Sequence, residues 1–220
     1  MPPAKPPRLR TIVYVDGFNL YYGCLKDSPF RWLDLHALCG HMLREDADIV
    51  AIKYFTARLK PRPGNPHQAQ RQQVYLRALG TVPNLTVHFG HFITRTATRR
   101  LVATKKGKPA FAEVWTTEEK GSDVNLASHL LIDGFHARYD LAVVISNDGD
   151  LKEPVRYVRH DLAAPVGVLN PHPNRSWALS PKQLPRGSFY KPLRKAVLAA
   201  SQFPDKLQDA QGVFRKPRGW

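Results

Sequence analysis

The stretch Thr11-Ile-Val-Tyr-Val-Asp-Gly-Phe-Asn19 decides the fold class. Its first five residues are β-branched or aromatic, which is typical of a strand buried on both faces. An acid and a glycine follow at once, so the strand is expected to end in a turn at Asp16-Gly17. A second apolar run at residues 141–146 leads into Asn147-Asp148-Gly149-Asp150. In a parallel sheet, acids at the ends of two such strands lie at the edge where ligands bind.

Apolar strands alternate with helical patterns along most of the chain. Strands are expected at residues 11–15, 49–59, 85–93, 141–146 and 164–169. Helices are expected at about residues 18–26, 33–43, 67–79, 123–138 and 150–160, with Ser122 as the cap of the fourth and Val124 on its inner face. This alternation predicts an α/β protein of the Rossmannoid type, in which helices cover both faces of a mostly parallel sheet.

Three parts are expected along the chain. Residues 1–10 contain four prolines, which prevent regular pairing, and are expected to form a flexible basic leader. Residues 11–171 are expected to form the main α/β domain, which carries the acids described below. Residues 172–220 are basic and interrupted by prolines, with one helical stretch near 193–201, and are expected to pack on the domain as an extension. The last residue, Trp220, could dock in a groove of the same or another subunit, although a frayed end is the default for a terminus.

The chain has 220 residues, of which 33 are Lys or Arg and 18 are Asp or Glu, giving a net charge of +15. This excess makes a polyanion the first partner to consider, nucleic acid ahead of a membrane, although the chain could also be an ordinary basic protein. The two cysteines, Cys24 and Cys39, lack the spacing of a disulfide scaffold or a four-cysteine zinc site. No run approaches the ~20 apolar residues that cross a bilayer, so we expect a cytoplasmic protein without membrane contact.

A basic segment lies between the third strand and the next acidic cluster. It contains no acid and six cations, namely Arg95, Arg99, Arg100, Lys105, Lys106 and Lys108. We expect an exposed hairpin or arm whose cations hold phosphates without reading bases. The aromatic residues Phe92, Phe111 and Trp115 flank it and could stack on unpaired bases or belong to the core. Lys120 could contact a phosphate or be a solvated surface residue.

The acids outside this segment suggest a metal site. Strand ends and helix starts share one edge of a doubly wound sheet, so Asp16, Asp123, Asp148 and Asp150 could converge as oxygen ligands for Mg²⁺ or Mn²⁺. Taken singly, each acid has a simpler explanation in a turn or in the first turn of a helix, where it offsets the helix dipole. Taken together, acids after two core strands in so basic a chain favour the metal site.

Three motifs also resemble a known family. In chain order they are Val13-Tyr-Val-Asp-Gly-Phe-Asn-Leu-Tyr21, Glu119-Lys-Gly-Ser-Asp-Val124 and Val144-Ile-Ser-Asn-Asp-Gly-Asp-Leu151. Their order and content resemble the NYN family of PIN-like nuclease domains, and the match covers about residues 11–170. The family usually has Gly and Ser where this chain has Asn147 and Gly149.

The resemblance implies a PIN-like α/β fold and a divalent-metal-dependent ribonuclease. Carried over by position, the four aspartates named above match the family's acidic metal-site residues, and Asn19 matches the polar residue after the first acid. Asn19 would orient a ligand or a substrate phosphate. Glu119 is placed at the same edge as a further catalytic candidate.

The expected activity is metal-assisted attack of water on RNA phosphodiester bonds, by an endoribonuclease. RNA, single-stranded or structured, is the expected partner, and the chain is compatible with a homodimer. Two alternatives stay open. One is a non-catalytic RNA-binding module on the same fold. The other is a hydroxylase acting on a small anionic aromatic compound, since some bacterial proteins resembling this family are assigned to hydroxylation of pyridine compounds; no flavin or nicotinamide motif supports it.

Overall fold

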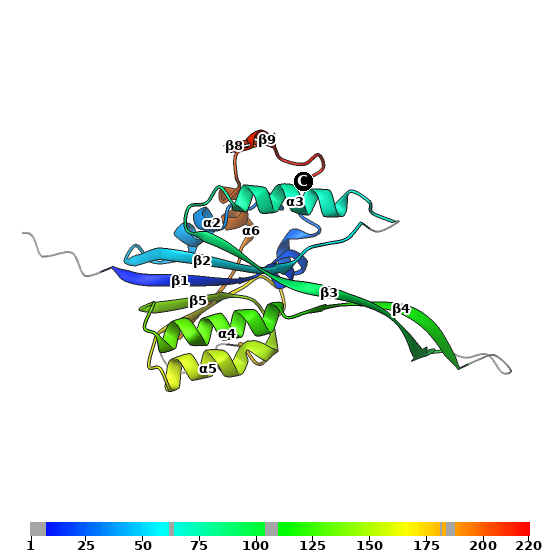
Figure 1. Cartoon of the computed structure of the whole chain (residues 1–220). Coiled ribbons are helices and arrows are strands. Elements are labelled where there is room, and N and C mark those ends of the chain that lie inside the picture. Colours follow the sequence, from blue (N-terminus) through cyan, green and yellow to red (C-terminus); the bar gives the residue numbers. More distant parts are fainter. Residues whose placement is uncertain (1–7, 62–63, 104–109, 181, 184–187) are drawn as a thin grey trace, which may run out of the picture.

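The computed structural model describes residues 8–61, 64–103, 110–180, 182–183 and 188–220. Their centre is a seven-stranded sheet in the order β4-β3-β2-β1-β5-β6-β7 (Figure 1). The strands are β1 Leu9–Asp16, β2 Ala47–Ala57, β3 Leu85–Arg100, β4 Phe111–Lys120, β5 Leu141–Ile145, β6 Val166–Asn170 and β7 Phe189–Pro192. All neighbours are parallel except β3 and β4. This confirms the predicted α/β fold with a mostly parallel sheet.

Helices cover both faces of the sheet. One face carries α1 Gly17–Leu20, the π-helical turn η1 Tyr21–Leu25, α2 Leu35–Met42, α3 Gln68–Leu79 and α6 Lys195–Ala200. The other carries α4 Ser122–Phe135, the 3₁₀ turn η2 Gly149–Leu151 and α5 Lys152–His160 (Figure 1). No helix in the described ranges combines the length and the apolar character needed to cross a membrane.

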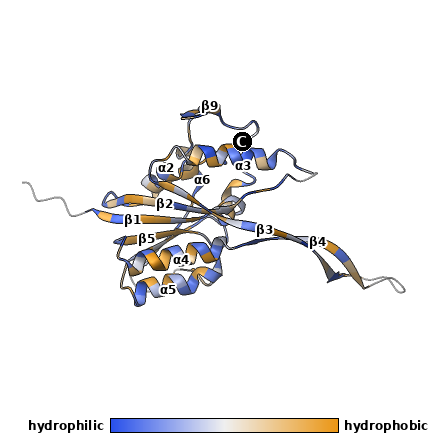
Figure 2. Ribbon diagram, in the orientation of Figure 1, coloured by the Kyte–Doolittle hydropathy of each residue, from blue (hydrophilic) through white to orange (hydrophobic). Residues whose placement is uncertain are grey.

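The central strand β1 shows why the chain folds into three layers. Val13 and Val15 belong to the core on the α2–α3 face, whereas Ile12 and Tyr14 belong to the core on the α4–α5 face. All four are at most 4% exposed. Because side chains alternate across a strand, a continuously apolar run fills both cores at once. Figure 2 shows hydrophobic residues along β1 and β5, and mixed character on α3, α4 and α5.

The C-terminal segment is built into this architecture. Strand β7 pairs with β6 in parallel and forms one edge of the sheet. Strands β8 Lys206–Asp209 and β9 Gly212–Arg215 form a small hairpin. A bidentate salt bridge connects it to α3, in which the guanidinium of Arg77 donates to the two carboxylate oxygens of Asp209 at 2.7 and 2.6 Å. The segment 172–220 therefore does more than pack on the domain, because it supplies a strand of the sheet.

The end of the chain docks on its own domain. Trp220 packs against Trp32 and Tyr75, with ring centroids 6.4 and 5.8 Å apart. Trp32 is fully buried and also contacts Phe203. The default expectation of a frayed end is therefore wrong, and of the two docked arrangements the structure shows docking within the same chain. At the other end, β1 begins at Leu9, inside the range expected for the leader; residues 1–7 lie outside the described part.

The start of α4 differs from the prediction. The helix begins at Ser122, and its N-cap is Gly121, whose φ of 95° is a left-handed conformation that glycine adopts without strain. The Ser122 hydroxyl instead donates to Glu119 at 2.8 Å. The prediction that Val124 faces the core is also wrong, since it is 68% exposed. At ~100° per residue it lies about 200° around the helix from the buried Leu126.

Strands β3 and β4 form the arm that the sequence predicts. They pair antiparallel from His91 opposite Lys120 to Arg100 opposite Phe111, and the hairpin extends beyond the body of the sheet (Figure 1). The strand expected to end at residue 93 continues to Arg100 because β4 supplies hydrogen-bond partners along this length. Lys105, Lys106 and Lys108 lie outside the described residues.

Candidate functional site

The first acid of the site is fixed by two neighbouring elements. Asp16 is the last residue of β1, is 4% exposed, and caps α1. Its Oδ1 accepts the backbone N–H of Asn19 at 2.9 Å, and its Oδ2 accepts the hydroxyl of Ser146, directly after β5, at 3.0 Å. The side chain is therefore held in one orientation before any ligand arrives.

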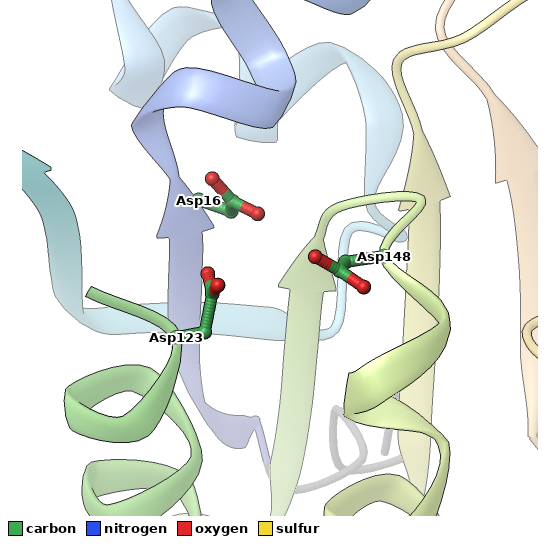
Figure 3. A group of neighbouring side chains, drawn as sticks. All are labelled: Asp16, Asp123 and Asp148. Carbon is green, nitrogen blue, oxygen red and sulfur yellow. The ribbon is translucent and has the colours of Figure 1, made fainter. Parts of the chain in front are cut away.

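Two more carboxylates face Asp16 from other elements. Asp123 lies in the first turn of α4, and Asp148 lies in the loop after β5, where it caps η2 by accepting the N–H of Asp150 at 3.0 Å. One carboxylate oxygen from each of Asp16, Asp123 and Asp148 lies within 4.8 Å of the others. Figure 3 shows the three side chains pointing into the space between β1, α4 and the β5 loop. We call these three residues the acidic triad.

The triad carries negative charge that no neighbouring side chain balances. Burial raises the pKa of Asp16 to about 7, and the charges of Asp123 and Asp148 add to this, while the hydrogen bonds from Asn19 and Ser146 oppose it. The pKa of Asp123 is also raised, by burial first and then by Asp148, Glu119 and Asp150. Within the described residues, no triad member forms an ion pair.

This arrangement fits a divalent cation. Three carboxylates from three elements supply hard oxygen ligands, the donor type that Mg²⁺ and Mn²⁺ prefer. A bound cation would supply the positive charge that the buried carboxylate of Asp16 lacks. The donor set contains no Cys and no His, so it does not suit a structural zinc ion.

The structure places the other predicted site residues beside the triad with different roles. Asp150 is exposed and lies outside the group of oxygens within 4.8 Å, although its charge acts on Asp123. Asn19 uses its Oδ1 to accept the N–H of Asn147 at 2.8 Å, so it ties α1 to the loop that carries Asp148. Glu119 accepts both the N–H and the hydroxyl of Ser122, at 3.2 and 2.8 Å, and so holds the start of α4.

The acidic triad opens into a pocket of about 470 Å³, which we call the acidic pocket. Phe92 and Thr117 reach it from the base of the arm, and Phe92 packs edge-on against Phe18 with centroids 5.7 Å apart. Tyr22, Gln68 and His172 also line it. Sequence reasoning did not single out these three. Tyr22 directly follows the first motif, whereas Gln68 and His172 come from α3 and a distant loop and carry no motif.

Of the predicted RNA-binding cations, those that the structure describes lie on β3 and β4 and do not line the acidic pocket. Lys120 pairs with Glu118 at 3.0 Å, and Arg95 approaches the same carboxylate at 3.8 Å. Arg99 and Arg100 are exposed farther along β3. Among the described residues, no Lys or Arg lines the acidic pocket. The arm can therefore bind a polyanion that extends beyond the pocket, but its described cations are not part of the pocket wall.

The aromatic residues that flank the basic segment separate into two kinds. Trp115 and Phe111 are 75% and 57% exposed on β4. Phe92 is partly buried beside the acidic pocket. Only the first two therefore present open aromatic faces on the arm.

Comparison with known proteins assigns the family. The NYN domain model matches residues 10–182, which include the whole acidic triad. The chain belongs to the NYN domain family. This confirms the resemblance seen in the three motifs, and it connects the chain with the PIN-like nuclease superfamily.

Two similar proteins extend the comparison. The chain is 27% identical to 6-hydroxy-3-succinoylpyridine 3-monooxygenase HspA of Pseudomonas putida, in a match that covers 96% of this chain and 75% of that protein. A crystal structure of a protein of unknown function from Vibrio parahaemolyticus superposes with a TM-score of 0.50 and 16% identity, covering 86% of this chain and 94% of that one. At this identity the second match shows a shared fold only.

Proposed function

We propose that this NYN domain is a divalent-metal-dependent endoribonuclease that hydrolyses RNA phosphodiester bonds at the acidic pocket. The observation that carries the proposal is the acidic triad, in which three carboxylates from separate elements converge and form no ion pair with any Lys or Arg that the structure describes. The family supports it, because PIN-like nucleases typically use divalent metals.

Each residue around the acidic pocket has its own role in the proposed reaction. Asp16, Asp123 and Asp148 would hold Mg²⁺ or Mn²⁺, which when bound polarises a phosphodiester and lowers the pKa of a coordinated water. Ser146 and the backbone of Asn19 keep the carboxylate of Asp16 oriented, so little reorganisation is needed when substrate arrives. Asp150 and Glu119 add negative charge at the rim of the site.

The arm supports the choice of RNA as substrate. Arg95 and Arg99 project from one face of the hairpin and Arg100 from the other, so the arm offers phosphate contacts on both of its faces. Trp115 and Phe111 on β4 expose aromatic faces on which unpaired bases can stack. Arg100, Phe111 and Trp115 lie on the face of the hairpin that carries Phe92 and Thr117. A strand held on this face would lead into the acidic pocket.

Cleavage of a labelled oligonucleotide tests the proposal. A single-stranded RNA and the DNA of the same sequence are incubated with Mn²⁺, with Mg²⁺ or with EDTA. We expect cleavage of RNA with metal, none in EDTA, and at least a ~100-fold loss in Asp148→Asn. Asp48→Asn is the matched control, since it changes an exposed carboxylate on β2 and should keep full activity. Cleavage that is equal in EDTA or in Asp148→Asn would overturn the metal mechanism. Chelator-insensitive RNA binding without cleavage would indicate a binding module.

A second candidate function is favoured by the curated relative. That relative is named as a monooxygenase acting on 6-hydroxy-3-succinoylpyridine, and the match spans nearly all of this chain. Hydroxylation would require O₂ and a two-electron donor, one oxygen atom entering the ring and the other leaving as water. If the protein consumes oxygen only when this pyridine is present and does not cleave RNA, the monooxygenase function is favoured and the nuclease proposal is wrong.

A further inference from the structure

A second cavity adjoins the acidic pocket and is not used by the reaction described above. It has a volume of about 220 Å³ and is lined by six aromatic residues, Phe18, Tyr21, Tyr22, Tyr54, Tyr75 and Trp220. We call it the aromatic cavity. Its volume is below the ~300–1,000 Å³ of pockets for drug-sized ligands, so it suits one small ring system.

The aromatic cavity and the acidic pocket share a wall. Phe18, Tyr22, Leu59 and Gln68 line both. Asp16 of the triad lies close enough to Tyr54 that its charge adds to the burial that raises the pKa of Tyr54. A ligand group in the aromatic cavity would therefore lie directly beside the triad.

The lining of the cavity has a net positive charge, because it contains the cations Lys26, Arg31 and Arg71 and the acid Asp27. Arg31 donates to the carbonyl of Ser28 at 3.0 Å, and Arg71 donates to Oδ1 of Asn65 at 2.8 Å. Both are neutral partners, and within the described residues neither arginine forms an ion pair with an acid. The pKa of Tyr21 is raised, mainly by burial. The charges of both arginines oppose this and the charge of Asp27 adds to it, so Asp27 and both guanidinium groups lie near Tyr21. Two guanidinium groups beside one aromatic wall are suited to an anion attached to a ring.

The aromatic wall itself is preorganised. Tyr75 contacts Tyr54 and Trp220, with ring centroids 6.4 and 5.8 Å away, and its hydroxyl donates to the carbonyl of Leu33 at 2.9 Å. Lys26 lies over the ring of Tyr22 at 5.5 Å. Rings held by such contacts lose little entropy when a flat ligand stacks on them.

The placement of the cations favours a nucleotide of a polymer over a free aromatic acid. The acidic pocket is lined by Phe92 and Thr117 at the base of the arm and shares Phe18 and Tyr22 with the aromatic cavity. Arg100 lies on the face of the arm that carries Phe92 and Thr117, and Arg31 and Arg71 line the aromatic cavity. A single strand crossing the triad would use both sets, whereas a small acid would use only one.

We propose that the aromatic cavity binds one unpaired nucleobase of the RNA, stacked against Tyr21, Tyr22 and Trp220, with its phosphate on Arg31 and Arg71. The inference rests on the proposed nuclease function and adds a substrate subsite to it. A base held there sets which phosphodiester lies over the triad. The last residue of the chain thereby becomes part of the substrate site.

Calorimetric titration with mononucleotides in EDTA tests the subsite without catalysis. The probes are UMP, uridine, inorganic phosphate and nicotinate. We expect UMP to bind more tightly than uridine or phosphate, and Arg31→Gln or Arg71→Gln to weaken UMP binding about tenfold. Arg44→Gln is the matched control, because Arg44 is exposed and remote from the cavity lining, and it should bind UMP normally.

Two variants test whether aromatic stacking contributes to UMP binding. Trp220→Ala should weaken UMP binding more than phosphate binding, since it removes a stacking face. Because Trp220 also packs on the core residue Trp32, this variant could fail to fold. Tyr22→Ala, at a residue that is 56% exposed, tests the same point without that risk.

The outcomes separate this inference from the nuclease proposal. Asp148→Asn should lose cleavage and keep UMP binding, because the triad is not part of the aromatic wall. Binding of UMP that depends on Arg31 and Arg71, in a protein that cleaves no RNA, would leave the subsite standing and end the nuclease proposal. Active nuclease without UMP binding would overturn the subsite alone. Tighter binding of nicotinate than of UMP would also overturn it, in favour of a small aromatic acid.

Discussion

The hydroxyl of Ser146 donates to Oδ2 of Asp16 at 3.0 Å, which joins the ends of two adjacent parallel strands. The same hydroxyl oxygen accepts the N–H of Asp148 at 3.0 Å. One small side chain thus sets the positions of two of the three triad carboxylates. Ser146 is fully buried, so this connection is shielded from water.

Removing this hydroxyl should weaken metal binding at neutral pH. In Ser146→Ala, Asp16 loses a hydrogen bond to its charged form, so its pKa should rise above about 7. Titration with Mn²⁺ at pH 7 should show several-fold weaker binding than in the wild type. At pH 9, where Asp16 is ionised in both proteins, the difference should narrow. Equal affinity at pH 7 would show that Ser146 does not control the triad.

Metal affinity should depend on pH in the range where Asp16 titrates. Because the pKa of Asp16 is about 7 without metal, protons compete with the cation below that pH. Mn²⁺ should raise the melting temperature strongly at pH 8 and much less at pH 6. Asp148→Asn should lose most of this stabilisation at both pH values, and Asp48→Asn should keep it. A stabilisation that does not change with pH would argue against Asp16 as a ligand.

The same pKa predicts the sign of a stability effect in the metal-free protein. The folded pKa of about 7 lies above the ordinary value of 3.8, so the fold favours the protonated form of Asp16. This contribution to stability is present below about pH 4 and is lost as the pH rises to 7. Asp16→Asn should therefore reduce the pH dependence of the free energy of unfolding. In EDTA at pH 8, this variant should be more stable than the wild type by on the order of a few kcal/mol.

Denaturant unfolding at pH 4 and pH 8 measures this effect. The difference between variant and wild type should grow from pH 4 to pH 8 in EDTA. Added Mn²⁺ should stabilise the wild type only, because the variant has lost a ligand charge. If the variant is less stable than the wild type at pH 8 in EDTA, the buried charge of Asp16 does not lower the free energy of unfolding.

The sequence predicts the centre of the fold and of the site for a common reason. The apolar runs before Asp16 and Asp148 are strong enough to define two neighbouring parallel strands, and parallel strands end at one edge. Asp123 joins them because it starts a helix at that edge. The three acids are therefore connected by local patterns and simple topology.

Other parts depend on long-range packing that leaves no local pattern. The docking of Trp220 on Trp32 joins residues almost at opposite ends of the chain. Strand β7 follows a proline-rich stretch and is defined by its pairing with β6, a partner that lies about 20 residues earlier in the chain. Asp150 shares its motif with Asp148, but the turn between them directs it to solvent.

A buried charge network under α4 provides a prediction about stability alone. Asp133 is 1% exposed and accepts hydrogen bonds from Tyr14 at 2.7 Å, from Arg138 at 3.0 Å and from Lys53. Burial alone would raise the pKa of Asp133, but the hydrogen bonds from Lys53, Tyr14 and Arg138 lower it. Its contribution to stability is therefore present above its ordinary pKa and lost as the pH falls through the lowered value.

Breaking this network should be costly and should leave the triad intact. Asp133→Asn removes the partner of the largely buried Lys53 and should cost about 3–5 kcal/mol in urea unfolding. The double variant Lys53→Met with Asp133→Asn should recover part of this loss, since the charge that remains without its partner, on Arg138, is half-exposed and not buried. Mn²⁺ affinity of the folded variants should be unchanged. A double variant as unstable as the single one would show that packing, rather than charge, dominates here.

The arm should contribute to RNA affinity through its charges, and this contribution should not depend on the base sequence of the RNA. Replacing Arg95, Arg99 and Arg100 by Gln should weaken binding about equally for unrelated single-stranded RNAs. The slope of log affinity against log salt should fall by ~0.7 for each phosphate that the variant no longer neutralises, or about 2 in total. Fluorescence anisotropy in EDTA over a range of salt concentrations measures both quantities. Cleavage at saturating RNA should persist, because these arginines do not line the acidic pocket.

The control for the arm must carry the same net charge. Replacing Arg44, Lys206 and Arg215 by Gln removes three exposed cations from the loop before β2 and from β8 and β9. This triple variant should bind RNA nearly as the wild type does, with an unchanged salt slope, because its cations are far along the chain from the arm and line neither pocket. If the two triple variants lose equal amounts of RNA affinity, RNA binding depends only on the overall charge of +15. A loss confined to the arm variant would place the phosphate contacts on β3, because the two variants differ only in where the charges are removed.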